Sequence, residues 1–158
     1  MRTIRTILIN LLLSILAIIL VILGLRLDPL WPFSLSPALA PIFWPLLLLG
    51  STLILWAAWT LAKHSGATGA PTDPTCALVT VGPYHWLRNP IYLGDILLLF
   101  GLACYLGSPT ILLLALLSIP IIHLFVCHIE EPHTERRLGE PYRQYKRSVP
   151  RWLPKITP

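Results

Sequence analysis

The sequence predicts an all-α integral membrane protein with about four transmembrane helices. Three observations predict this class. Only 12% of the 158 residues are charged, whereas an average soluble domain has about 25%. The chain is 55% hydrophobic with a mean hydropathy of +0.71, and four apolar stretches have lengths close to a bilayer crossing. Residues 1–158 suit a single membrane domain, because a chain of this length rarely holds more than one.

The first apolar stretch runs from Ile7 to Leu25 and has 19 residues, close to the roughly 20 that cross a hydrocarbon core. Arg2 and Arg5 precede it, and Arg26 follows it. A secretory signal peptide also has a basic start and an apolar middle. Its apolar region is shorter, at about 7–15 residues, so we interpret this stretch as a retained anchor.

The second apolar stretch runs from Ile42 to Leu61. Trp44 and Trp59 lie near its two ends, where tryptophan is typical of a membrane–water interface. Pro45 falls in its first turn, where the missing backbone N–H costs least. The pattern therefore predicts a second crossing.

The third and fourth stretches run from Ile91 to Leu106 and from Thr110 to Val126. Only three residues, 107–109, separate them, and so short a connection forces a tight antiparallel helical hairpin. Each arm is slightly short for a full crossing, which favours either a locally thinner bilayer or cover by other helices. Pro120 should kink the second arm.

The distribution of basic residues predicts the topology. If four helices cross and the N-terminus is cytoplasmic, Arg26 alone among the twelve Lys and Arg faces the opposite side. This asymmetry indicates that both termini, the loop 62–89 and the tail 129–158 are cytoplasmic. The net charge of +5 then indicates contact with anionic lipid headgroups, and we expect no nucleic-acid partner.

The tail predicts a short cytoplasmic helical segment. Leu138, Tyr142 and Tyr145 fall near helical spacing with Arg and Lys between them, a pattern typical of an amphipathic segment on a membrane surface. His123 and Cys127 share one helix face, but a metal site needs further ligands, so we expect none. The scattered cysteines Cys76, Cys104 and Cys127 do not form a disulfide framework.

Polar residues gather at two places that the hairpin brings together. One is the end of the cytoplasmic loop, and the other is the end of the fourth stretch. The hairpin returns the chain to the same membrane surface, so we expect one pocket at the membrane edge. Its predicted lining is Tyr84, Arg88, Tyr92, His128, Glu130 and Glu131.

The residues of these two places form an ordered pattern. It reads G-P-Y-x-W-x-R-N-P-x-Y-x-G from Gly82 to Gly94, then the pair Glu130–Glu131, then L-G-x-x-Y-x-x-Y-x-x-x-V-P-R from Leu138 to Arg151. The pattern resembles the isoprenylcysteine carboxyl methyltransferase family, to which phospholipid N-methyltransferases are related. The resemblance covers residues 76–154, and the first two stretches carry no part of it.

The resemblance implies a membrane methyltransferase that takes S-adenosylmethionine from the cytosol and a lipophilic acceptor from the bilayer. Asn89 stands where the family often has histidine, and an amide keeps a hydrogen bond there. The matching positions imply that the cofactor is held by Cys76, Ala77, Leu78, Val79, Tyr84, Asn89, Pro90, Ile91, Tyr92 and Glu130.

The chemistry of the cofactor leads to a similar set. S-adenosylmethionine carries a sulfonium, an ammonium and a carboxylate, so its pocket needs an acidic group, a basic group and an apolar wall. Glu130 or Glu131 supplies the acid, Arg88 the base, and Tyr84 with Trp86 the wall. The methyl group is already activated, so the protein has mainly to align the donor with the acceptor and exclude water.

The acceptor decides whether a base is needed. A carboxylate acceptor is ionised at pH 7 and needs none, whereas an amine acceptor has to lose a proton, for which His128 is the nearest candidate. Carboxyl methyltransferases tend to carry an arginine shortly before the glutamate pair, and His128 is the nearest residue to that place. We therefore predict that His128 contacts the acceptor, while the sequence assigns no catalytic residue.

Three alternatives stay open beside carboxyl O-methylation. The first is a phospholipid N-methyltransferase. The second is a four-span small-molecule transporter that uses Asp95, a carboxylate one turn inside the third stretch, where a charge is costly and often functional. The third is a non-catalytic membrane subunit.

Overall fold

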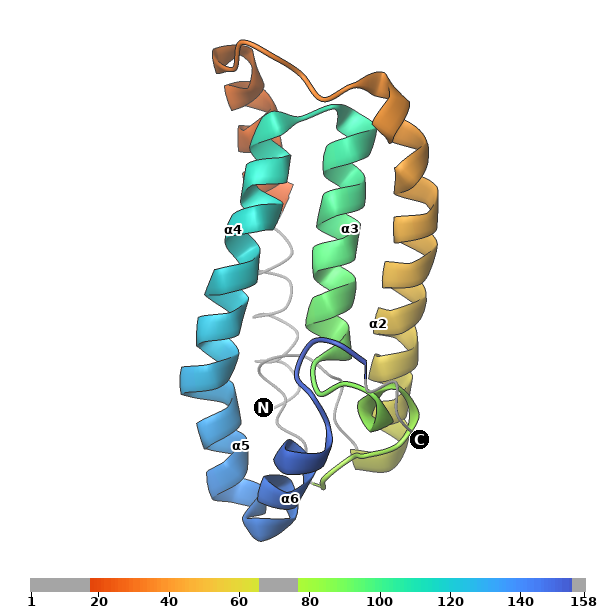
Figure 1. Ribbon diagram of the computed structural model, residues 1–158, viewed down its shortest axis with the longest axis vertical. Helices are drawn as coiled ribbons and strands as arrows, with labels where there is room; N and C mark the ends of the chain where they lie inside the picture. The colour runs from red at the N-terminus through yellow and green to blue at the C-terminus, as the bar shows by residue number, and fades with distance from the viewer. Residues whose placement is uncertain (1–17, 66–76, 155–158) are drawn as a thin grey trace, which may run out of the picture.

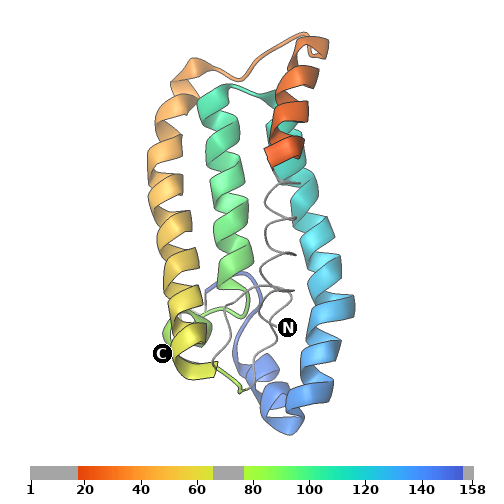
Figure 2. The ribbon, with the colours of Figure 1, turned by 180° about the vertical axis from the view of Figure 1, so that it is seen from behind.

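The computed structural model describes residues 18–65 and 77–154, and the regular structure in these ranges is helical throughout. Three long helices lie side by side (Figure 1): α2 (Phe43–Ser65), α3 (Pro90–Leu106) and α4 (Pro109–Phe125). Helical residues 18–27 lie beside α4 (Figure 2). Short 3₁₀ helices connect or precede these elements: η1 (Asp28–Leu30), η2 (Pro37–Ile42) and η3 (Gly82–His85).

Two helices in the described ranges are long and apolar enough to cross a membrane. They are Pro37–His64, which joins η2 to α2, and Pro109–Leu138. The apolar helix α3 has 17 residues and is shorter. Leu48 and Leu55 of α2 are about 70% exposed, as expected of side chains that face lipid. Most of the first predicted stretch, residues 7–17, lies outside the described residues, so the count of four spans stays a prediction.

The hairpin of α3 and α4 has the predicted boundaries to within one residue at each end. Gly107 ends α3 with φ of 65°, a left-handed conformation that favours glycine. Ser108 then begins α4 as its N-cap, because its Oγ accepts a hydrogen bond of 3.0 Å from the Ile111 N–H. The three-residue turn therefore contains both the stop signal and the start signal.

Two helices continue beyond the predicted apolar stretches. The helix of the second stretch, α2, ends at Ser65, four residues after Leu61. After α4, a π-helical turn, η4 (Val126–Glu130), carries the helix on into α5 (Glu131–Leu138). Pro132 supplies a physical reason for the wide turn, since a proline ring clashes with the carbonyl four residues before it in a regular α-helix.

The turn end of the hairpin is tied to the segment before α2. One carboxylate oxygen of Asp28 accepts hydrogen bonds from Ser108 Oγ at 2.9 Å and from the Thr110 N–H at 3.1 Å. Burial alone would raise the pKa of Asp28, but these bonds outweigh it and lower the pKa below its ordinary value. Trp31 Nε1 donates to Thr110 Oγ1 at 2.9 Å. Because its carboxylate binds the first residues of α4, Asp28 stabilises the positive N-terminus of that helix.

Small residues let α2 and α3 approach each other closely. A Cβ placed on Gly94 would lie 2.5 Å from Ile54 Cγ1 and 2.8 Å from the backbone oxygen of Gly50. A Cβ on Gly50 would in turn lie 2.9 Å from the Gly94 oxygen. Close contact between small residues is a common basis of helix packing in membranes, where no hydrophobic force draws helices together.

Gly94→Ala is expected to lower the free energy of unfolding by about 1–3 kcal/mol, because the new methyl overpacks the contact with the α2 backbone. Thermal unfolding of the purified protein in detergent measures the change. Gly24→Ala is the matched control, since its Cβ would meet Ile111 Cγ1 at an ordinary 3.4 Å. Equal midpoints for both variants would contradict the close α2–α3 contact.

The chain folds back after α5. Gly139, with φ of 66°, ends α5, and α6 (Glu140–Ser148) begins directly after it. Tyr142, Tyr145 and Val149 form a buried cluster, against which Leu78 and Leu138 pack. The segment 77–89, the start of α3, α5 and α6 therefore gather at one end of the helices (Figure 1).

Candidate functional site

The centre of this end is the carboxylate of Glu131, whose side chain is only 5% exposed. Arg88 Nη1 donates to its Oε1. Arg151 binds it with two hydrogen bonds, Nε to Oε1 at 2.8 Å and Nη2 to Oε2 at 2.9 Å. Lys146 Nζ lies 3.8 Å from Oε2. Three cations from three different segments thus share one buried carboxylate.

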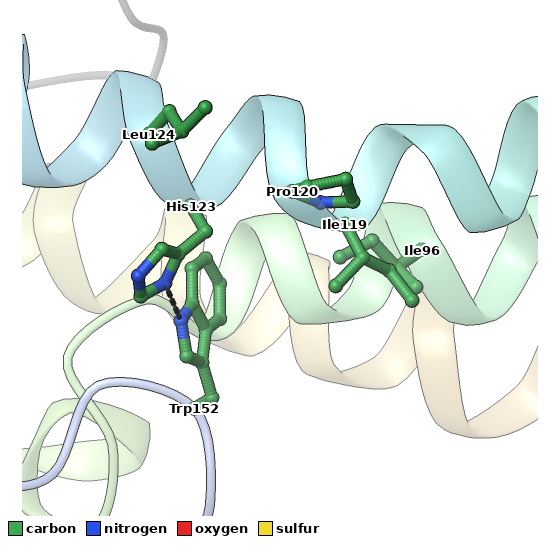
Figure 3. Close-up of a pocket in the computed structure, with 6 residues that line it drawn as sticks. All are labelled: Ile96, Ile119, Pro120, His123, Leu124 and Trp152. Atoms are coloured by element: carbon green, nitrogen blue, oxygen red, sulfur yellow. Dashed lines mark hydrogen bonds between the residues drawn. The ribbon is translucent and has the colours of Figure 1, made fainter.

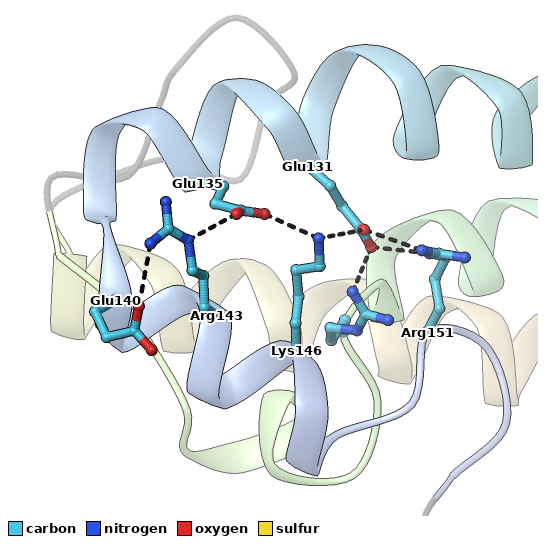
Figure 4. A network of polar contacts seen from close by, with 7 residues as sticks. Glu131, Glu135, Glu140, Arg143, Lys146 and Arg151 are labelled. Carbon is cyan, nitrogen blue, oxygen red and sulfur yellow. Dashed lines mark hydrogen bonds and ion pairs between the residues drawn. The ribbon is translucent and has the colours of Figure 1, made fainter.

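Figure 4 shows how this network extends along α5 and α6. Lys146 also pairs with Glu135 at 2.9 Å, and Arg143 joins Glu135 and Glu140 at 2.9 and 3.1 Å. The outer pairs are more exposed than the Glu131 cluster, and exposed ion pairs add little stability. The Glu131 cluster is therefore the part that holds α5, α6 and the start of α3 together.

The same cluster affects the ionisation of Arg151, because its hydrogen bond to Glu131 raises the pKa of the Arg151 guanidinium.

Glu130 has different surroundings from its neighbour. Its Oε2 accepts a hydrogen bond of 2.7 Å from the Tyr92 hydroxyl, and Tyr92 is a neutral donor. Glu130 is half-buried, and no ion pair to it is recorded among the described residues. Its negative charge is thus available to a cation from outside the chain, whereas the charge of Glu131 is already neutralised within the protein.

One tyrosine hydroxyl and one backbone bond fasten α6 and the segment after it to the loop before α3. The Tyr145 hydroxyl donates to the Tyr84 carbonyl oxygen at 2.7 Å, and the Arg88 N–H donates to the Pro150 carbonyl oxygen at 2.9 Å. Burial raises the pKa of Tyr84 and of Tyr145. Burial and the nearby Glu131 raise the pKa of Tyr142 to about 12. These phenols therefore stay protonated at physiological pH.

Two buried donors at this site have no hydrogen-bond partner among the described residues. They are Arg88 Nε and Asn89 Nδ2. Asn89 is 8% exposed and begins α3 without using its side chain as a cap. A buried donor without a partner costs about 1–3 kcal/mol, so each of these groups calls for a hydrogen-bond acceptor that the described chain does not supply.

The structure brings most of the predicted site residues to this end of the helices. Val79, Tyr84, Asn89 and Pro90 are buried, while Leu78, Ile91, Tyr92 and Glu130 are half-buried. Ala77 is exposed. Cys76 lies outside the described residues. The predicted meeting of the Arg88 loop with the glutamate pair is confirmed by the direct contact of Arg88 with Glu131.

Two polar residues lie differently from the rest. His128 is exposed, and its Nδ1 is 3.0 Å from the Leu124 carbonyl oxygen of its own helix. It therefore does not take part in the Glu131 cluster, and its contact with an acceptor stays a prediction. Asp95 is exposed on α3. Arg88, the basic residue that begins the same segment, pairs with Glu131 and not with Asp95.

Sequence reasoning did not identify the partners that the later segment supplies. Arg151, Lys146 and Tyr145 each contact the loop before α3 or the glutamate pair. A signal for them was present, because Tyr145 and Arg151 belong to the ordered pattern from Leu138 to Arg151. The π-helical turn had a weaker signal, a proline directly after the glutamate pair.

Comparison with known proteins relates the chain to a family and to a bacterial protein. The model of the phospholipid methyltransferase family matches residues 42–141. A protein of Haemophilus influenzae (strain ATCC 51907 / DSM 11121 / KW20 / Rd), described only as an uncharacterized protein, is 35% identical over 63 residues, which are 40% of this chain and the whole of that relative.

Proposed function

The chain belongs to the phospholipid methyltransferase family, and from this premise we propose that it transfers a methyl group from S-adenosylmethionine to a lipophilic acceptor in the membrane. The observation that carries the proposal is that one end of the helices holds both a carboxylate without a recorded ion pair and two buried donors that have no partner among the described residues. A zwitterionic cofactor with an added sulfonium needs both kinds of group.

The residues at this end fit the cofactor as follows. Glu130 faces the cationic part, since its charge is not neutralised by the described chain. Arg88 Nε and Asn89 Nδ2 donate to the cofactor's carboxylate or other acceptors. Tyr84, Ile91 and Val79 supply an apolar wall, because they pack in one cluster. When bound, S-adenosylmethionine supplies a methyl group that its sulfonium has already activated.

Glu131 has a positioning role in this proposal. It fixes Arg88 by a direct ion pair and the segment after α6 through Arg151. The site then needs little rearrangement when the cofactor binds, and preorganised groups contribute most to catalysis.

We propose a carboxylate as the first candidate for the reacting group of the acceptor. A carboxylate is ionised at pH 7 and needs no general base. His128, the predicted base for an amine, is exposed and bonded to its own helix, which favours an acceptor that needs none. Isoprenylcysteine-like compounds belong to this class.

A phospholipid amine is the second candidate, and the description of the family supports it. Glu130 is the candidate base that would deprotonate this amine. Its partner Tyr92 is neutral, and Glu130 has no recorded ion pair among the described residues. The transporter alternative, which relies on Asp95, and the non-catalytic subunit predict no methyl transfer at all.

We further propose that the protein is multi-pass and that the site lies on the cytoplasmic side. The basic residues support this orientation, because Arg88, Lys146 and Arg151 all lie at the site end, and cytoplasmic loops are enriched in Lys and Arg. The cofactor would then be reached from the cytosol.

Methyl-labelled S-adenosylmethionine, incubated with membranes that contain the protein, tests the proposal. We expect label in an extracted lipid or lipid-linked product, and about 10–100-fold less in membranes with Glu130→Gln when the donor is scarce. Mild base separates the two candidates, because it hydrolyses a methyl ester and releases labelled methanol but leaves an N-methyl group in place. No labelled lipid and no bound donor would overturn methyl transfer as the function.

A further inference from the structure

A second feature lies on the apolar side of the polar site. A cavity of about 340 Å³ opens between α3 and α4, within the range of small-molecule pockets, about 300–1,000 Å³. Figure 3 shows its lining: Ile96 of α3, then Ile119, Pro120, His123 and Leu124 of α4, and Trp152 of the segment after α6.

The polar atoms at the end of this cavity satisfy each other. Trp152 Nε1 donates to His123 Nδ1 at 3.0 Å. An indole N–H can only donate, so His123 Nδ1 carries no proton in this geometry. The other ring nitrogen, Nε2, lies 3.5 Å from Cys127 Sγ. The cavity therefore offers little to a polar ligand or to water, because apolar cavities stay dry.

The residues that line the cavity are close in the chain to residues of the polar site. Trp152 directly follows Arg151, which binds Glu131. Along the helix, His123 precedes Glu130 by seven residues, or about 10 Å at the rise of an α-helix. This separation is short enough for one molecule to occupy the cavity with an apolar chain and reach the site with its polar end.

The place of the cavity in the fold decides the kind of occupant. Its walls belong to two apolar helices, and Pro109–Leu138 is long enough to cross a bilayer. Pro120, which lines the cavity, lacks the N–H for a regular helical bond, and prolines bend helices. An apolar cavity walled by these two helices suits a hydrocarbon chain from the bilayer.

We propose that this cavity holds one hydrocarbon chain of the acceptor, and that Trp152, fixed by His123, forms the wall that selects which chains reach the polar site. The proposal rests on the proposed function, which identifies the methyl acceptor as the molecule that carries the hydrocarbon chain. It assigns Ile96, Ile119 and Trp152 as specificity-determining residues.

Photocrosslinking tests the occupant without requiring catalysis. The probe is a phospholipid with a diazirine on one acyl chain, in vesicles of phosphatidylethanolamine and phosphatidylglycerol that contain the full chain. We expect labelling of Ile96 and Ile119 several times above that of Leu48 and Leu55, the exposed side chains of α2. Equal labelling on all four residues would overturn the proposal, because it would show only ordinary lipid contact.

A cavity-filling variant with a matched control adds a second readout. Ile96→Trp should abolish crosslinks to Ile119 and lower kcat/KM for a long-chain acceptor by about 10–100-fold, as changes of pocket size do. Leu48→Trp adds the same side chain on the lipid face and should change neither. Donor binding should stay unchanged in both variants. Retained Ile119 crosslinks in a folded Ile96→Trp protein would contradict the assignment.

Trp152 has its own test, which separates selection from structure. Trp152→Ala should raise kcat/KM for bulkier chains relative to the wild-type preference, while Trp152→Phe should keep that preference with a smaller loss of rate. An unchanged chain preference in Trp152→Ala would remove its selecting role. If the wild type binds no donor but Ile96 and Ile119 are crosslinked, the cavity stands and the proposed methyl transfer fails.

Discussion

Glu130→Gln is expected to weaken the binding of S-adenosylmethionine by about 10–100-fold, which corresponds to the roughly 1.5–3 kcal/mol of a hydrogen bond to a charged group. The substitution keeps the shape of the side chain and an oxygen for the Tyr92 hydroxyl, which donates to Glu130 at 2.7 Å. It removes only the charge that the cation of the cofactor would meet. Equilibrium binding of labelled donor to the purified protein in detergent gives the dissociation constant.

Asp95→Asn is the matched control for this loss. It removes one carboxylate charge from the adjacent helix α3, where Asp95 is exposed, and it should leave donor binding nearly unchanged. The reverse result, loss of binding in Asp95→Asn and none in Glu130→Gln, would show that the site assignment is wrong and would favour a role for Asp95 in transport.

Glu131→Gln is expected to destabilise the protein by about 3 kcal/mol, at the lower end of the cost of breaking a buried ion pair. Glu131 is 5% exposed and Arg88 10%, so the variant leaves buried positive charge without its partner. The lower end applies because Arg151 is 23% exposed and stays partly hydrated. Thermal unfolding in detergent measures the effect.

Glu140→Gln serves as the control, since it removes the same charge from an exposed pair with Arg143. Exposed pairs contribute little, so its unfolding midpoint should stay close to that of the wild type. If Glu131→Gln unfolds like the wild type but no longer binds the donor, Glu131 contacts the cofactor directly and its positioning role is wrong.

The helices could be predicted from the sequence because their signals are local. The apolar stretches from residue 91 to 106 and from 110 to 126 have clear ends, marked by Asn89–Pro90 and by Gly107–Ser108, and the structure has α3 and α4 there. The hairpin then required Arg88 and the glutamate pair to share one end, which the Arg88–Glu131 contact confirms.

The different surroundings of the two glutamates could not be predicted in the same way. Glu130 and Glu131 are adjacent and chemically identical, and only side-chain partners from distant segments distinguish them. Arg151 lies 20 residues away from Glu131, and Tyr92 lies 38 residues from Glu130. No local pattern encodes such pairs.

The partner of Trp152 could not be predicted for a related reason. A tryptophan among basic residues is typical of the membrane interface, and this composition does not indicate a partner within the protein. In the structure Trp152 bonds to His123, 29 residues earlier. The interface preference of tryptophan says nothing about whether its N–H finds water, lipid or a side chain.

The position of Arg151 in the chain has a consequence for biogenesis. Arg151 is translated after every helix that it links, and domains form progressively as the ribosome elongates the polypeptide. Until it emerges, Glu131 lacks two of its hydrogen bonds and the loop before α3 lacks its anchor at Pro150. A released chain truncated just before Pro150 should therefore keep its helices but bind ligand poorly, because the groups that order the site are missing.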